Sequence, residues 1–234
     1  MKTAFFPAIA LICLLIASCK KDGTPAKTET FTVDFNNGLQ NWSVGFSDYN
    51  ESHGDMELDS EIAALPAPLD TTKKGLKVQG HNRSDDLFMF IKHKVTGLAP
   101  NQNYRVKIEL TFASNAPSGA VGVGGAPGES VFVKAGATKT EPLSTKKTDG
   151  TYEMNIDKGQ QSNSGADMKV IGDVANGTDK FEYVSLTRNS GNQTITVKTD
   201  AQGACWLIAG TDSGFEGLTR LYYQQLKATL EPAD

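Results

Sequence analysis

Polar side chains that could hold a ligand gather in loop-like segments of this sequence. The first segment, at 80–86, contains Asn82, Arg83, Asp85 and Asp86. A guanidinium group forms paired hydrogen bonds with acidic or sugar ligands, so these residues are candidates for ligand binding. They also fit an ordinary turn, in which Asn82 and Asp85 bond to their own backbone and Arg83 forms an ion pair. The sequence leaves both interpretations open.

Two later segments add further candidates. Residues 112–129 are rich in glycine and end at Glu129. Their glycine spacing matches neither a phosphate-binding loop nor the dinucleotide pattern. Long loops often carry function, so Glu129 is a candidate ligand-binding residue, with an exposed loop charge as the alternative. Residues 155–167 contribute Asp157 and Lys158 in the same way.

Several kinds of chemistry find no support in the residue pattern. The three histidines show no short paired spacing, and the chain contains neither Cys-x-x-Cys nor His-Glu-x-x-His, the patterns that hold zinc. We therefore expect no transition metal, haem or nucleotide. Cys205 lies in an apolar run, which predicts a buried, unreactive thiol. The sequence shows no recognisable catalytic motif.

The elements that must position these loops are β-strands. Residues 103–113 alternate between apolar and polar side chains, which predicts a strand with one buried face. Residues 87–91 are apolar on both faces, as in a central strand that is covered on each side. Only residues 56–65 read as a short helix. Further strands are predicted at 30–35, 42–46, 75–79, 130–135, 152–156, 169–174, 182–188, 194–198, 204–209 and 226–230.

Turn residues separate these strands at intervals of roughly 8–12 residues, the spacing of sandwiches and barrels. We predict an all-β fold, an antiparallel β-sandwich (jelly roll) of about 10–12 strands with little helix. The chain shows no fixed repeat and no Pro/Ser-rich linker after residue 29. Residues 30–234 are therefore predicted to form a single domain.

Three stretches resemble carbohydrate-binding and galactose-binding-like jelly rolls. They are the entry at 31–42, the turn at 95–104 and the closing run at 221–230. The resemblance implies a glycan ligand. It also implies a structural calcium ion near the first and last strands, and Asp212 and Glu216 are the predicted ligands because carboxylate oxygens suit this hard ion.

The N-terminus resembles that of an exported bacterial lipoprotein. Its apolar run at 4–17 is too short for a membrane core that takes roughly 20 apolar residues, and it fits a secretory signal. Ile16-Ala17-Ser18-Cys19 resembles the lipobox, and Ser-Cys-Lys-Lys-Asp resembles the mature start of lipoproteins from the Bacteroidetes group. The resemblance implies a signal peptide at 1–18. It also implies a thioether-linked diacylglycerol and a further acyl chain, such as palmitate, on Cys19.

Residues 19–29 are then predicted to be a lipidated tether in the bacterial cell envelope. Lys20 stands where an aspartate would resemble an inner-membrane retention signal, so an outer-membrane address is expected. The side of that membrane stays open. Without residues 1–18, the chain has 22 Lys and Arg against 27 Asp and Glu. This acidic balance, with no basic stripe, argues against nucleic acid as a partner.

The leading hypothesis is a lipid-anchored module that binds a glycan without catalysis. The first alternative is a hydrolase or lyase that acts on glycans, which needs two loop carboxylates about 5 Å or 6.5–9.5 Å apart for glycoside hydrolysis. A pocket lined jointly by Arg83, Glu129, Asp157 and Asp212 would favour it. The second alternative is a structural role in the envelope.

Overall fold

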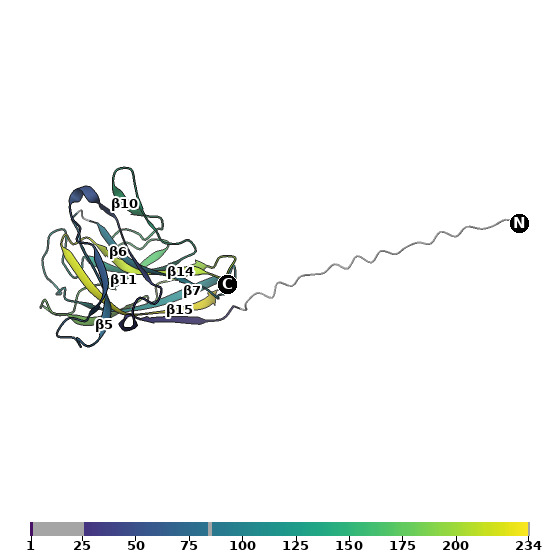
Figure 1. The fold of residues 1–234 in the computed structure, drawn as a ribbon, viewed down its shortest axis with the longest axis horizontal. Helices are drawn as coiled ribbons and strands as arrows, with labels where there is room; N and C mark the ends of the chain where they lie inside the picture. The colour runs from purple at the N-terminus through teal and green to yellow at the C-terminus, as the bar shows by residue number, and fades with distance from the viewer. Residues whose placement is uncertain (2–25, 84–85, 234) are drawn as a thin grey trace.

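Fifteen β-strands and two short 3-10 turns form the regular structure of the described residues (Figure 1). This structure is a computed structural model that describes residue 1, residues 26–83 and residues 86–233. The predicted signal peptide and Cys19 lie outside those residues, and so does Asp85. No helix among the residues described is long and apolar enough to cross a membrane.

Two antiparallel sheets form the sandwich, and a third small sheet lies outside it. Sheet 1 has the order β12-β7-β15-β5-β4, with β1 also beside β15 and β13 also beside β7, and sheet 2 has the order β11-β8-β14-β6-β2. Sheet 1 comprises β1 (Glu29–Asp34), β4 (Asp59–Ala64), β5 (Lys74–His81), β7 (Asn103–Ser114), β12 (Val184–Asn189), β13 (Ile195–Lys198) and β15 (Leu218–Ala233). Sheet 2 comprises β2 (Ser43–Ser47), β6 (Leu87–Val95), β8 (Val131–Thr138), β11 (Met168–Asp173) and β14 (Cys205–Ser213).

Sheet 3 has the order β3-β10-β9. It comprises β3 (Tyr49–Asn50), β9 (Ser144–Lys146) and β10 (Thr151–Met154), and the 3-10 turns are η1 (Phe35–Asn37) and η2 (Glu51–His53). Sheets 1 and 2 together contain twelve strands of the described residues. The predicted fold class, an antiparallel β-sandwich of about 10–12 strands with little helix, is confirmed.

The hydrophobic core lies between sheets 1 and 2. In β7 the alternation is as predicted: Tyr104, Val106, Ile108, Leu110 and Phe112 are all buried, whereas Arg105, Lys107 and Glu109 between them are exposed. In β6 both faces are buried, also as predicted. Leu87, Met89 and Ile91 belong to the main core, and Phe88 and Phe90 belong to a second cluster on the outer face of sheet 2.

The second cluster needs a cover, and residues 139–167 provide it. We call this stretch the cover segment; it contains β9, β10 and the loop that follows. Its Met154 and Ile156 pack against Phe88 and Phe90. In Figure 1, β10 lies above the layer that contains β6 and β14, and β7 and β15 lie below that layer. The outer face of sheet 2 is therefore partly buried, and a separate cluster of Leu65, Ala113 and Tyr222 is buried on sheet 1.

One sequence prediction of secondary structure was wrong. Residues 56–65 contain no helix, and residues 59–64 form β4. This strand pairs antiparallel with β5, with Ile62 opposite Leu76. Pairing with an existing sheet satisfies every other backbone group of the segment and buries part of its apolar side chains, which outweighs a weak local helical pattern.

The start of the first strand, β1, and the end of the last strand, β15, lie at the same end of the molecule (Figure 1). Glu29, the first residue of β1, is opposite Leu230, close to the C-terminus of β15. Leu218 begins β15 at the other end, where it pairs with His81. The start of β1 therefore lies at the end of the sandwich opposite to the start of β15.

Candidate functional site

A buried ion pair lies on the outer face of sheet 2. Lys134 of β8 and Asp212 of β14 project from neighbouring strands, and both side chains are 0% exposed. Lys134 Nζ lies 2.7 Å from Asp212 Oδ2. Two charges that are shielded from solvent are tolerated only when they are paired and hydrogen-bonded. The cover segment, which lies over this pair, supplies the additional hydrogen bonds.

The cover segment contributes a second lysine to the same carboxylate. Lys158 Nζ lies 2.7 Å from Asp212 Oδ2 and 2.7 Å from Asp48 Oδ2. Lys134 Nζ in turn donates to the Lys158 carbonyl at 3.0 Å, and the Gln161 backbone N–H donates to Asp212 Oδ2 at 2.9 Å. These contacts tie the loop of the cover segment to the two central strands of sheet 2.

Asp86 completes the cluster. Asp48, Asp86 and Asp212 each place a carboxyl oxygen within 4.8 Å of one from the others. Burial and the negative charge of Asp212 raise the pKa of Asp86 to about 8, and a hydrogen bond between the two side chains adds to this shift. At neutral pH Asp86 is therefore mostly an uncharged carboxylic acid.

The pKa values of the other buried groups shift in different directions. Burial alone would raise the pKa of Asp212, but the charges of Lys158 and Lys134 outweigh it and keep that pKa below its ordinary value. For Lys158, the nearby carboxylates likewise overcome burial and raise the pKa. At Lys134 burial dominates and lowers the pKa, although the charge of Asp212 opposes this shift.

Asp48 and Asp86 also line an open pocket. One half of this pocket has a volume of about 320 Å³, and the adjoining half, of about 310 Å³, shares Asp48, Asp86 and Glu153 with it. We call the two halves together the acidic pocket. Its other lining residues are Tyr49, Asn50, His53, Thr151, Tyr152, Met154, Ile156, Asp157, Lys158, Gly159 and Gln160.

Two tyrosines form one wall of the acidic pocket. The rings of Tyr49 in β3 and Tyr152 in β10 stack at a centroid distance of 4.6 Å and an interplanar angle of 10°. The Tyr152 hydroxyl donates to Glu51 Oε1 at 2.7 Å, and that carboxylate also binds Lys146. The stacking contact and the hydrogen bond together hold the Tyr152 ring in this wall.

The three carboxyl groups offer oxygen atoms of the kind that Ca²⁺ binds. However, Asp212 Oδ2 already accepts from two lysines and one backbone N–H. A cation bound by all three groups would have to move Lys158, whose ammonium group takes the place of a metal charge. Glu216, the other predicted calcium ligand, is exposed, and its backbone N–H donates to the Val123 carbonyl. The calcium site stays a prediction.

The structure places three of the predicted ligand-binding residues together. Asp86, Asp157 and Lys158 all line the acidic pocket. Asp157 also organises the loop, because its carboxylate accepts the backbone N–H groups of Ala166 and Gly159. These two bonds lower the pKa of Asp157.

The other candidates have structural contacts elsewhere. Asn82 is buried, and its side-chain amide donates to the carbonyls of Ser213 and Phe215. Arg83 donates to Glu57 Oε1 at 2.9 Å, which is the ion pair of the alternative interpretation. Glu129 accepts from the Gly119 backbone N–H at 2.8 Å.

Sequence reasoning missed several residues of the site. Asp48 and Lys134 lie in or beside strands, 86 residues apart along the chain, and only the pairing of sheet 2 and the cover segment brings them together. Tyr49 and Tyr152 meet because β3 pairs with β10. An uninterrupted apolar strand at 87–91 was the available signal, because it required some segment to cover the outer face of sheet 2.

The prediction for Cys205 agrees with the structure. Its side chain is buried, and burial raises the pKa of the thiol to about 12. Trp42 is a core residue, with Phe35 and His93 against its ring. Trp206 is only partly buried, and it lies on sheet 2 with Lys92 Nζ 5.4 Å from its ring centroid.

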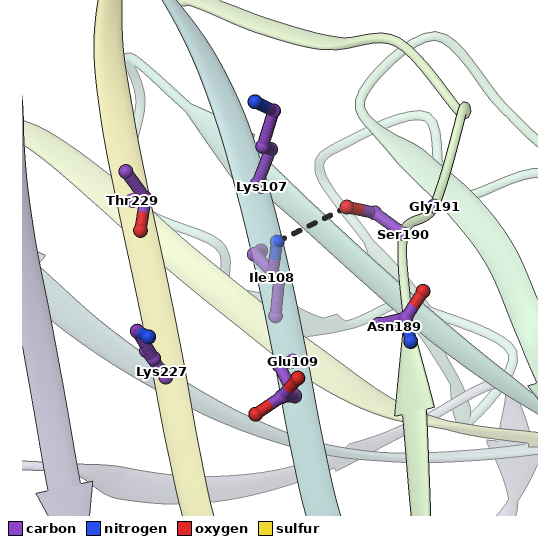
Figure 2. A pocket seen from close by; sticks show the side chains of 8 residues that line it. All are labelled: Lys107, Ile108, Glu109, Asn189, Ser190, Gly191, Lys227 and Thr229. Atoms are coloured by element: carbon purple, nitrogen blue, oxygen red, sulfur yellow. Dashed lines mark hydrogen bonds between the residues drawn. The ribbon is translucent and has the colours of Figure 1, made fainter.

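A hollow on sheet 1 provides a contrast (Figure 2). It has a volume of about 260 Å³ and lies over β7 and β15, beside the end of β12. Ser190 accepts the Ile108 backbone N–H at 3.1 Å, so its hydroxyl supports the strand where β12 ends. The remaining lining is polar and includes Lys107, Glu109 and Lys227 but no aromatic side chain.

No protein-family model and no curated protein matches this chain. Among solved structures, the chain is similar to the CBM22-1 xylan-binding domain of Paenibacillus barcinonensis Xyn10C, with 13% identity, a TM-score of 0.40 and coverage of 90% of this chain and 99% of that one. It is similar to the mannan-recognising module TmCBM27 at 9% identity and a TM-score of 0.38, over 87% of this chain and 98% of that one. It is also similar to the K1 adhesin domain of Lys-gingipain from Porphyromonas gingivalis W83, at 9% identity and a TM-score of 0.34, over 88% of this chain and 99% of that one. The fold described above stands on the strand pairing of the chain itself.

Proposed function

We propose that this protein is a lipid-anchored envelope protein whose β-sandwich binds a glycan, without catalysis, in the acidic pocket. The observation that supports this most is that the carboxyl groups of Asp48 and Asp86 line one pocket with an aromatic wall. Asp86 is mostly a neutral acid at pH 7, and Asp48 is a carboxylate held by Lys158. Because the Asp86 proton is shared with Asp212, both carboxyl groups would accept hydrogen bonds from sugar hydroxyls, which can donate.

The aromatic wall supports the same ligand class. The stacked rings of Tyr49 and Tyr152 line the pocket with Asn50 and Thr151, and Lys146 Nζ lies over the Tyr152 ring, 5.7 Å from its centroid. Small-molecule sites commonly combine apolar or aromatic walls with a few polar groups that fix orientation. A ring with an apolar face and hydroxyl edges matches this combination. Because Glu153 and Asp157 add negative charge, an uncharged glycan is favoured over an acidic one at this pocket.

A glycan array tests this proposal. The purified full chain in mild detergent, without added calcium, is expected to bind at least one uncharged oligosaccharide. Tyr152→Ala should weaken that binding at least tenfold. Tyr183→Ala, a matched tyrosine on sheet 1 that packs edge-on against Tyr222, should leave it unchanged. Failure of the unmodified chain to bind any uncharged glycan, with or without calcium, contradicts the proposal.

The same carboxyl pair favours a second candidate, a glycan hydrolase. Retaining glycosidases hold two carboxyl groups about 5 Å apart, and carboxyl oxygens of Asp48 and Asp86 lie within 4.8 Å of each other. Against this, Asp48 is ion-paired and the acid of Asp86 is bonded to Asp212. Incubation of each bound glycan with the protein, followed by an assay for new reducing ends, separates the two. Cleavage that Asp86→Asn abolishes would establish the enzyme.

The membrane anchor is a separate part of the proposal. It rests on the sequence of residues 1–29, in which Cys19 is the proposed site of lipidation and the envelope, with an outer-membrane address, the proposed location. Mass spectrometry of the protein extracted from bacterial membranes should find a mature N-terminus at Cys19 with the mass of attached acyl chains. Cys19→Ala should release the protein from the membrane fraction. An unmodified cysteine would contradict this part alone.

A further inference from the structure

A second groove lies at the end of the sandwich opposite to the start of β1. It has a volume of about 130 Å³ and is formed where β7 ends and β15 begins. Phe181, Phe215 and Leu218 contribute its apolar surface, and Asn115, Thr219 and Arg220 contribute its polar groups. We call it the end groove.

Exposed apolar side chains gather around the end groove. Of the six large hydrophobic residues that are exposed within 26–233, four lie at this end, three on loops and one at the start of β15. They are Val121, Val123, Phe181 and Leu218, and the Phe181 ring is 74% exposed. Apolar surface concentrated in one place on a monomer marks a binding site more often than scattered single residues do.

The loop that presents Phe181 is held in one conformation. Asn176 is buried, and its side-chain amide donates to the carbonyls of Lys180 and Glu182, on either side of Phe181. The backbone N–H of Asn176 donates to Ala116, and the N–H of Ser118 donates to Thr178. An aromatic ring kept exposed by a pre-organised loop loses little conformational entropy when a ligand covers it.

Arg220 gives the end groove its charge. It is the one charged residue among the described residues that line the groove. Its Nε–H donates to Gln79 Oε1 at 2.7 Å, and it also shares a hydrogen bond with the Tyr183 hydroxyl. A guanidinium group has five N–H donors in a planar fork, so these two contacts orient the group and leave donors for a carboxylate.

We propose that the end groove binds the terminal hexuronate residue of an acidic glycan. The Phe181 ring would stack on the apolar face of the sugar, Arg220 would pair with its carboxylate, and Asn115 would bond a hydroxyl. The volume admits about one ring. The groove is opposite in charge to the acidic pocket and lies at the end of the sandwich away from residue 26.

Isothermal titration with uronate oligomers tests the proposal. The purified full chain in detergent is titrated with tetramers of galacturonate, glucuronate and mannuronate, and with the methyl ester of each. At least one acidic tetramer should bind, and its uncharged ester should bind at least tenfold more weakly. Arg220→Gln and Phe181→Ala should each cost at least tenfold in affinity, while Arg220→Lys, which keeps the charge and loses the fork, should cost less than Arg220→Gln.

Matched controls make the result specific. Arg105→Gln removes an exposed arginine of β7, and Leu39→Ala removes an exposed apolar residue outside these loops; both should leave affinity unchanged. Thermal unfolding of each variant verifies that it folds. Tyr152→Ala should also leave uronate binding intact, which separates this site from the acidic pocket. Equal binding of acid and ester, unchanged binding by Arg220→Gln, or binding only of peptides with a C-terminal carboxylate would overturn the proposal.

Discussion

The outer face of each sheet carries a lysine–carboxylate ion pair, but one pair is exposed to solvent and the other is buried. On sheet 1, Lys107 and Glu231 form an ion pair at 2.8 Å with side chains 56% and 33% exposed. On sheet 2, Lys134 and Asp212 form one at 2.7 Å with side chains 0% exposed. An exposed pair contributes about 0–1 kcal/mol, whereas breaking a buried one is strongly destabilising. The cover segment, and not the residue types, makes the difference.

The largest expected effect comes from removing the shared carboxylate of sheet 2. Asp212→Ala leaves Lys134 buried without an anionic partner, and we expect a loss of about 3–5 kcal/mol in the free energy of unfolding. Glu231→Ala on sheet 1 is the matched control and should change stability little. Urea unfolding at pH 7 measures both. Equal effects of the two variants would break the comparison.

The next effect is a pH dependence confined to sheet 2. Between an unfolded pKa near 3.8 and a folded pKa of about 8, Asp86 holds a proton in the folded state that the unfolded chain has lost. Stability should therefore fall as pH rises through this range, with a contribution of at most about 1.4 kcal/mol per pH unit. Asp86→Asn imitates the neutral acid and should remove this contribution, so that it stabilises the protein more at pH 8 than at pH 5. Asp59→Asn on sheet 1 should preserve the slope.

A smaller effect is expected in the cover segment itself. Met154→Ala and Ile156→Ala each shorten a partly buried side chain against Phe88 and Phe90, and we expect about 1–2 kcal/mol for each, below the cost at a fully buried site. Hydrogen exchange of the Gln161 amide, which donates to Asp212, should become faster in both variants. Unchanged exchange would show that the cover is not held by this apolar contact.

The smallest effect is expected in the hollow of sheet 1. Lys107→Ala removes an exposed side chain from its rim, and the free energy of unfolding should stay within about 0.5 kcal/mol of the unmodified value. Increasing salt should weaken even this difference, because exposed charges are screened. A loss near that of Asp212→Ala would mean that exposure does not explain the contrast between the sheets.

The residue pattern predicted the sandwich better than it predicted the site. Alternation at 103–113 identified β7 because one face meets the core and the other meets water. The two apolar faces of residues 87–91 predicted a covered strand, but they did not identify the covering residues. Asp86, Asp157 and Lys158 were predicted as loop residues, and they do line one pocket.

The sequence alone could not identify which charged residues pair with one another in the buried cluster. Lys134 and Asp212 are 78 residues apart, and Lys158 reaches them from the cover segment. Nothing local in their strands indicates a buried charge, since an isolated lysine in an alternating strand reads as an exposed residue. The neutral state of Asp86 depends on burial and on the nearby charge of Asp212, so it follows only from the packed structure.

The central claim is that a neutral Asp86 lines a glycan-binding pocket at physiological pH. Carbon-13 NMR of the aspartate carboxyl groups, assigned with Asp86→Asn, measures its titration directly in the free protein and with the bound glycan. We expect a midpoint at about pH 8 in the free protein and a shift of that midpoint when the glycan binds. A midpoint near the ordinary aspartate value, or one that glycan leaves unchanged, would contradict this account.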